Sequence, residues 1–297
     1  MHYAYRGMKL FWVAICFFVA TQVARAQIQV ELKFKRLQYV AYEPVTAMLT
    51  ITNLAGRDVD LHDVGTQRWF GFEVTGGEQQ LLAPASLQSE PPLHIESGKT
   101  VSRKIDIATA YPVHDFGTYH VRANVFFADL NKFFYSEAKV FQVTNARPIW
   151  QKTVGVPDGQ PGAGGTRTYS LLSNRFPDHT SLYVRVEDRN NSMVYSTYSL
   201  GRVISFEEPQ VEIDRANQLH VLHCAAPRTW AYSHVGLNGE LLKQSTFLQV
   251  KSQPHLRRAS DGLVAVHGGV IDEPIANKAQ NAAPKLSARP PNIPQED

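Results

Sequence analysis

The sequence predicts an all-β protein built from two consecutive antiparallel β domains. In residues 27–146 apolar and polar side chains alternate with a period of two, which is typical of half-buried strands. Residues 147–272 contain repeated units, each made of a strand, a polar turn and a second strand. The length of 297 residues suits about two domains of ordinary size.

Residues 1–26 have the pattern of a secretory signal peptide. Two basic residues precede the apolar run Leu10–Ala20, and the segment ends in Ala-Arg-Ala, a small-x-small cleavage pattern. We therefore expect an exported, periplasmic or extracellular protein whose mature chain begins at Gln27. The alternative is an uncleaved anchor, but the apolar run is shorter than the ~20 residues that span a bilayer.

Cleavage would change the charge balance of the chain. The sequence has 30 basic and 27 acidic residues, and loss of Arg6, Lys9 and Arg25 leaves 27 of each. A neutral mature chain gives no electrostatic reason to expect a nucleic-acid partner or an acidic membrane surface. Cys224 would be the sole mature cysteine, so no intrachain disulfide is possible and packing must stabilise the fold.

The first domain is predicted from strand periodicity. Ile28–Phe34 alternates apolar residues with polar or charged ones, and in Val45–Thr52 apolar residues alternate with threonines and Met48. Seven strands in ~120 residues, with no convincing helix, favour a β-sandwich. The expected strands are 28–34, 45–52, 59–61, 69–74, 101–107, 119–125 and 135–143.

A short motif in the first domain resembles a corner found in a known class of β-sandwich. Asp115, Gly117 and Tyr119 lie in DFGTYHV, which resembles the D-x-G-x-Y corner of immunoglobulin-like domains. The resemblance implies an immunoglobulin-like β-sandwich in which the tyrosine hydroxyl binds upstream backbone and the motif forms a structural corner. Antibody domains have a cysteine two residues after this tyrosine, whereas this chain has Val121. Residues 43–53 also look like exported bacterial immunoglobulin-like modules.

The second domain is organised around its repeat. Leu182–Gly201 and Leu219–Asn238 align at an offset of 37 residues, and an incomplete third copy begins at Leu263. Units of this kind resemble the blades of a β-propeller, which implies propeller-like hairpin repeats. Propellers usually have four or more blades, and there is room here for about three. Either a partner chain completes a ring, or the hairpins form a smaller open sheet packed against the sandwich, which we favour.

Two further segments lack periodicity. The Gly- and Pro-rich stretch 156–165 is a loop, which serves either as a hinge or as a long connection within the second domain. Residues 273–297 are rich in Pro, Ala and Asn and cannot bury a core, so we expect a disordered tail.

The histidines invite a metal hypothesis. His220 and His223 are an odd number of positions apart on a predicted strand and therefore point to opposite faces. His223 and His267 share a repeat position and could converge, together with His234, if the sheet curls. We favour hydrogen-bonded histidines instead, because no acidic or cysteine ligand recurs with them. The sequence thus predicts no metal and no cofactor, and it makes Cys224 a small buried hydrophobe.

Aromatic residues are the most promising candidates for binding. The repeats contain five of them, which on an exposed sheet would bind a protein or a polysaccharide. The alternative is that they pack between layers. The five residues are Tyr183, Tyr195, Tyr198, Trp230 and Tyr232.

No nucleophile elbow or phosphate-binding loop is present in the sequence. The leading functional hypothesis is an exported, non-catalytic binding or structural protein that acts through β-sheet surfaces or edges. The alternative is a carbohydrate-active enzyme or small-ligand-binding protein with a site between the two β domains. The two differ in one observation, since the enzyme requires a pocket where carboxylates or histidines converge.

Overall fold

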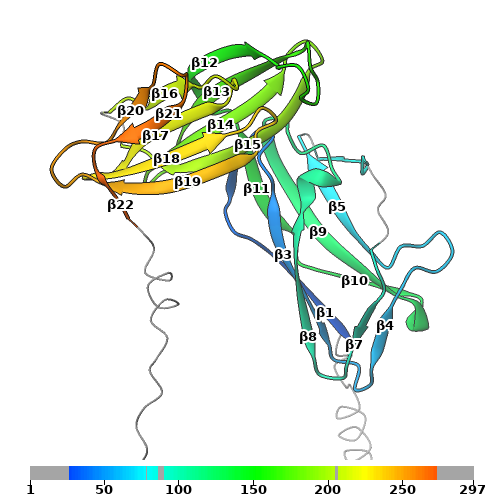
Figure 1. The fold of residues 1–297 in the computed structure, drawn as a ribbon. Coiled ribbons are helices and arrows are strands. Elements are labelled where there is room, and N and C mark those ends of the chain that lie inside the picture. The colour runs from blue at the N-terminus through cyan, green and yellow to red at the C-terminus, as the bar shows by residue number, and fades with distance from the viewer. Residues whose placement is uncertain (1–26, 78, 86–89, 205–206, 273–297) are drawn as a thin grey trace, which may run out of the picture. The chain divides into compact units, whose positions relative to one another are not determined.

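The computed structural model describes residues 27–77, 79–85, 90–204 and 207–272, and it confirms the all-β class (Figure 1). The chain divides between Ala146 and Arg147 into two compact units, at the residue where the sequence analysis ended the first β domain. The expected signal peptide, 1–26, and the expected tail, 273–297, lie outside the described residues.

The first unit contains eleven described strands and two single-turn 3-10 helices. Its strands are β1 (Ile28–Phe34), β2 (Gln38–Val40), β3 (Thr46–Asn53), β4 (Val59–Leu61), β5 (Phe70–Gly76), β6 (Gln80–Leu81), β7 (Leu93–Ile95), β8 (Thr100–Asp106), β9 (Gly117–Phe127), β10 (Lys132–Tyr135) and β11 (Lys139–Thr144). The 3-10 helices are η1 (Ile107–Thr109) and η2 (Ala128–Leu130).

Two sheets of the first unit pack face to face around one hydrophobic core. One sheet has the order β1-β3-β8, and the other has the order β2-β11-β9-β5-β6, with β10 also paired to β9. Strand alternation turns Ile28 and Val30 of β1 inward, where they share the core with Val121 and Val125 of β9. The period-two pattern therefore marks the buried face of these strands.

Eleven strands replace the seven that periodicity predicted. Three of the additional strands, β2, β6 and β7, have two or three residues, which is too short for a periodic signal. The fourth arises because the expected strand 135–143 is interrupted at Ser136. The Ser136 hydroxyl accepts the Ala123 N–H at 3.0 Å, so a side chain takes the place of a backbone acceptor and separates β10 from β11.

The second unit contains eleven described strands in three layers. They are β12 (Arg147–Gly155), β13 (Thr166–Arg175), β14 (Thr180–Asp188), β15 (Met193–Arg202), β16 (Gln210–Ile213), β17 (Leu219–Ala226), β18 (Thr229–Val235), β19 (Leu241–Leu248), β20 (His255–Arg258), β21 (Val264–His267) and β22 (Val270–Ile271).

The middle layer of the second unit separates two cores. The first sheet is β12-β13-β14-β15, the second is β16-β17-β18-β19-β22, and β20 and β21 form a short hairpin. Val184 of the first sheet and Val221 of the second lie in the core between those two sheets. Leu222 and Trp230 face the other way and pack with Leu256 of the hairpin. Because neighbouring residues of β17 point to opposite faces, the second sheet is buried on both sides.

The repeated segments form two hairpins, β14–β15 and β17–β18, which lie in different stacked sheets. The expectation that they build one open sheet is therefore wrong. Val184 and Val221 share a core, as equivalent positions should. Tyr195 also packs against this core, but Tyr232 belongs to the other one. The cause is a register shift in β14–β15 after Val186, since a β-bulge changes the face to which the following residues point.

Two other segments of the second unit, residues 156–165 and the incomplete third repeat copy, differ from or narrow the sequence-based expectations. Residues 156–165 join β12 to β13, which are neighbours in one sheet, so this loop is a connection within the second unit and not a hinge between domains. The incomplete third copy at Leu263 leads into β21, the second strand of its hairpin rather than the first. Among the described residues of this unit, the strand order of each sheet stays open and no ring is closed.

Candidate functional site

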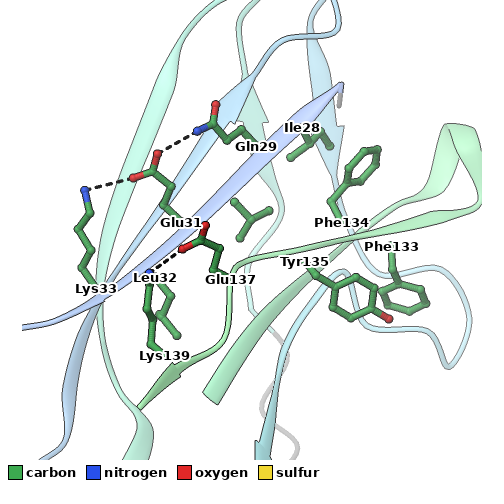
Figure 2. Close-up of a pocket in the computed structure, with 11 residues that line it drawn as sticks. Ile28, Gln29, Glu31, Leu32, Lys33, Phe133, Phe134, Tyr135, Glu137 and Lys139 are labelled. Atoms are coloured by element: carbon green, nitrogen blue, oxygen red, sulfur yellow. Dashed lines mark hydrogen bonds and ion pairs between the residues drawn. The ribbon is translucent and has the colours of Figure 1, made fainter. Parts of the chain in front are cut away.

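A groove runs along β1, between its open edge and β10. It encloses about 530 Å³ and is lined by residues 28–33 of β1, residues 133–135 of β10, and Glu137 and Lys139. Figure 2 shows the charged side chains of β1 with Glu137 and Lys139 on one side and the aromatic side chains of β10 on the other. The volume lies in the range of ordinary ligand sites, roughly 300–1,000 Å³. A second hollow of about 280 Å³, next to Trp150 in the second unit, is smaller.

Paired charges form the polar rim of the groove. Glu31 accepts a hydrogen bond from Gln29 at 2.9 Å and lies 3.2 Å from the Lys33 ammonium (Figure 2). Lys139 donates to Glu137 at 2.8 Å, and this contact lowers the pKa of the Glu137 carboxyl. The rim therefore presents alternating positive and negative side chains.

The aromatic wall comes from three consecutive residues of β10. Phe134 is buried in the core of the sandwich, while Tyr135 is exposed and Phe133 is half-buried. The Arg122 guanidinium lies 5.0 Å from the centroid of the Tyr135 ring. No strand periodicity or repeat singles out this wall, although the run Phe-Phe-Tyr in the sequence is a visible signal for it.

The five aromatic residues proposed from the repeats do not form an exposed binding surface. Tyr183, Trp230 and Tyr232 are buried, and Tyr195 and Tyr198 are half-buried against the core between the sheets. Burial raises the pKa of the Tyr198 hydroxyl to about 12. The expected surface is wrong, because Tyr195 and Tyr198 pack against the core between the two sheets and Trp230 and Tyr232 lie in the core beneath the short hairpin. The packing alternative describes these residues.

A second cluster of chemically active groups lies in the middle sheet of the second unit. His220 of β17 and His234 of β18 stand directly opposite each other, with their rings stacked 4.1 Å apart. Asp214, which follows β16, places Oδ2 3.2 Å from His220 Nε2 and 3.9 Å from His234 Nε2. One atom from each of the three residues lies within 4.8 Å of the others.

Hydrogen bonds hold the rings of this cluster in place. His220 Nδ1 lies 2.8 Å from the Tyr232 hydroxyl, and His234 Nε2 lies 2.8 Å from Gln218 Oε1. Burial lowers the pKa of both His220 and His234, and repulsion from His220 and Lys243 lowers that of His234 further. Both rings are therefore neutral at neutral pH, and His234 Nε2 carries the proton that it donates to Gln218 Oε1.

The convergence of His223, His234 and His267 that the metal alternative required does not occur. His223 is fully buried and donates through Nε2 to the Arg202 carbonyl at 3.1 Å. His267 stands opposite His255 on the short hairpin, with ring centroids 6.1 Å apart. His234 meets His220 instead, because the register of the β17–β18 hairpin places these two residues side by side.

The remaining candidates have structural environments. The Tyr119 hydroxyl donates to the Asp115 carbonyl at 2.8 Å, which is the contact that the corner motif led us to expect, and Gly117 between them has a φ of +152°. Cys224 is buried in the core beneath the short hairpin, and burial raises the pKa of its thiol.

Comparison with known proteins does not identify a family for this chain. No protein-family model matches it, and no curated protein matches its sequence. Among solved structures, it is similar to the sporulation control protein Spo0M from Bacillus subtilis, with 9% identity over 57% of this chain and 83% of Spo0M and a TM-score of 0.28. In the described part of the chain no helix is long and apolar enough to cross a membrane.

Proposed function

We propose that this chain is an exported, non-catalytic binding protein that takes up an extended strand of another polypeptide along the open edge of β1. The groove between β1 and β10 is the observation that supports the proposal. An extended peptide that adds to a sheet edge gains backbone hydrogen bonds along its length and specificity from alternate side chains. A groove at an edge strand offers the unpaired backbone groups for these hydrogen bonds and the surrounding side chains for this specificity.

The backbone groups that face the groove follow from the register of β1. The Leu54 N–H donates to the Gln27 carbonyl at 2.8 Å, directly beyond the pair Ile28–Asn53. In an antiparallel ladder, hydrogen-bonded and non-hydrogen-bonded pairs alternate. The amides of Ile28, Val30 and Leu32 therefore point away from β3, toward the edge, where the described residues provide no partner strand.

The side chains around the groove suit a strand that alternates apolar and polar residues. A strand added beside β1 would direct every second side chain inward, toward Phe134 and the core of the sandwich. Its other side chains would lie beside Glu31 and Lys33, where opposite charges on neighbouring strands stabilise the pairing. The expected ligand is thus an amphipathic extended segment with outward charges of both signs.

The rim carboxylates support binding rather than hydrolysis. The groove contains two of them, Glu31 and Glu137, and a glycosidase also places two carboxyl groups beside its substrate. Such an enzyme requires one carboxyl with a raised pKa that can act as a general acid. Lys139 instead lowers the pKa of Glu137, and Glu31 lies beside Lys33.

Selection of phage-displayed linear peptides on the mature chain, followed by hydrogen exchange, tests the proposal. Selected peptides should alternate apolar and polar residues, and they should slow exchange of the Ile28, Val30 and Leu32 amides. The Gln29 and Glu31 amides, which point toward β3, are the internal control because they should already exchange slowly. Peptides that bind without protecting the three edge amides, or a selection without enrichment, would exclude strand addition at β1.

A further inference from the structure

The cluster of Asp214, His220 and His234 has the composition of a metal site, and it is independent of the groove on β1. Two imidazoles and one carboxylate present three ligand atoms within 4.8 Å of one another. Imidazole nitrogens and carboxylate oxygens together are ligands that Zn²⁺ and neighbouring transition metals accept. The ligands come from two paired strands and the turn between β16 and β17, so the sheet itself holds them together.

The distances fit a tetrahedral ion after a small adjustment. Zinc binds imidazole nitrogen and carboxylate oxygen at about 2.0–2.2 Å, which places neighbouring ligand atoms roughly 3.3–3.5 Å apart. His220 Nε2 and Asp214 Oδ2 are already 3.2 Å apart. His234 Nε2 lies 3.9 Å from the same oxygen, so its ring needs to approach by about 0.5 Å and to tilt out of its 16° stack on His220 so that both lone pairs point at the ion.

Outer contacts orient two of the three ligands, as they do around metal ions. The Oδ1 atom of Asp214 accepts the N–H groups of Ala216 and Gln218, each at 2.9 Å, which leaves Oδ2 directed at the histidines. The Tyr232 hydroxyl lies 2.8 Å from His220 Nδ1 and can accept its proton when Nε2 binds an ion. A neutral imidazole then needs only to move its proton from Nε2 to Nδ1.

We infer that Asp214, His220 and His234 form a binding site for a divalent first-row transition metal, with Zn²⁺ as the best match. Gln218 Oε1, 2.8 Å from His234 Nε2, can join as a fourth oxygen ligand or turn away when the ion binds. Glu212, opposite His220, adds negative charge, and Lys243, opposite His234, opposes it. The side chain of His234 is 21% exposed, which gives the ion a path from solvent.

Titration of the untagged, metal-free mature chain with Zn²⁺ and Co²⁺ tests the inference. We expect one equivalent of Zn²⁺ by calorimetry, a raised melting temperature through linkage, and visible absorption bands from Co²⁺. His234→Gln removes a direct ligand at a half-buried position, so it should weaken Zn²⁺ binding by more than the ~10–100-fold that loss of an outer contact costs, with little change in the fold. Asp214→Asn, which retains an oxygen for the turn, should also weaken binding and alter the Co²⁺ spectrum.

The chain offers a matched control. His255 and His267 are also opposite each other on paired strands and have stacked rings, but both are exposed and belong to no described cluster with a carboxylate. The double variant His255→Gln/His267→Gln should bind Zn²⁺ as the parent does. Failure of the parent to bind either ion, or binding that survives in His234→Gln and disappears in the control variant, would overturn the inference.

Discussion

The guanidinium carbon of Arg167 lies 4.1 Å from the centroid of the Tyr195 ring, inside the second unit. Arg167 is buried, donates to the Asn238 side chain and to the Thr166 carbonyl, and lies 3.6 Å from the Asp188 carboxylate. This buried cation thus joins β13, the β14–β15 turn and the turn after β18. The same contact covers Tyr195, which the sequence analysis had proposed as part of a binding surface.

Loss of the Arg167 side chain should destabilise the second unit strongly. Arg167→Ala removes the cation beside Asp188, the hydrogen bonds to Asn238 and Thr166 and the contact with the Tyr195 ring, so it should lower the urea midpoint clearly. Arg167→Lys should cost less, because it keeps the charge but loses the forked donors. Urea denaturation measures both. Arg189→Ala, at a solvent-exposed ion pair with Glu187, is the control and should cost about 1 kcal/mol or less.

Substitution of two glycines that have nearly equal φ angles distinguishes the cost of backbone strain from the cost of a steric clash. Gly159 has a φ of +81° and open space where a Cβ would lie, whereas Gly239 has a φ of +83° and a Cβ there would collide with the Ser196 side chain. Gly159→Ala should cost roughly 1–2 kcal/mol through backbone strain alone. Gly239→Ala should cost clearly more, because the turn after β18 must move away from β15. Equal denaturant midpoints for the two variants would contradict the close approach of these segments.

The corner of the first unit makes a stability prediction. Tyr119→Phe removes the hydrogen bond to the Asp115 carbonyl and should lower the free energy of unfolding by about 1 kcal/mol. The ring stacks on Phe141 with centroids 5.2 Å apart, and the substitution preserves this contact. Tyr135→Phe, at an exposed ring, is the matched control and should lie within about 0.5 kcal/mol of the parent. A midpoint for Tyr119→Phe equal to that of the parent would show that the hydroxyl contributes nothing.

His223 should make stability depend on pH. Burial lowers its pKa to about 4 in the folded chain, against an ordinary value of 6.5. Above pH 6.5 the ring is neutral in both states. Between pH 6.5 and 4 the unfolded chain binds a proton that the folded chain does not, so stability falls as pH falls, by up to about 1.4 kcal/mol per pH unit.

Replacing His223 tests this assignment. His223→Gln keeps a donor for the Arg202 carbonyl and removes the titrating group, so its unfolding free energy should fall less between pH 7 and 5 than that of the parent. The difference between the two pH profiles isolates His223 from other titrating groups. Parallel profiles would show that the ring is protonated equally in both states.

Export should remove the first 26 residues. If the protein is exported, mass spectrometry should find Gln27 at the N-terminus, because the charged start, the apolar run and the Ala-x-Ala ending are typical of a cleaved signal peptide. A chain that retains Leu10–Ala20 in a membrane fraction would favour the uncleaved anchor instead.

The sequence by itself determined the all-β class and the buried faces of the longer strands. Alternation in β1 and β9 is a local pattern, and it identified Ile28, Val30 and Val121 as inward-facing before any pairing was known. The corner was equally accessible, because Tyr119 and the Asp115 carbonyl are four residues apart. Interactions between near neighbours depend on few conformational choices, so a short motif can specify them.

The tertiary structure decided which distant segments contact one another. The repeats preserved their residues, but one register shift after Val186 sent Tyr195 and Tyr232 into different cores. The register of β17 and β18 placed His220 directly opposite His234. Spacing along one strand showed only that His220 and His223 point to opposite faces, and it did not predict the partner of His220 on the next strand. The groove exists because the edge of β1 has no partner strand beside β10 among the described residues. Each of these outcomes depends on strand pairing or layer stacking between distant segments, which local periodicity does not specify.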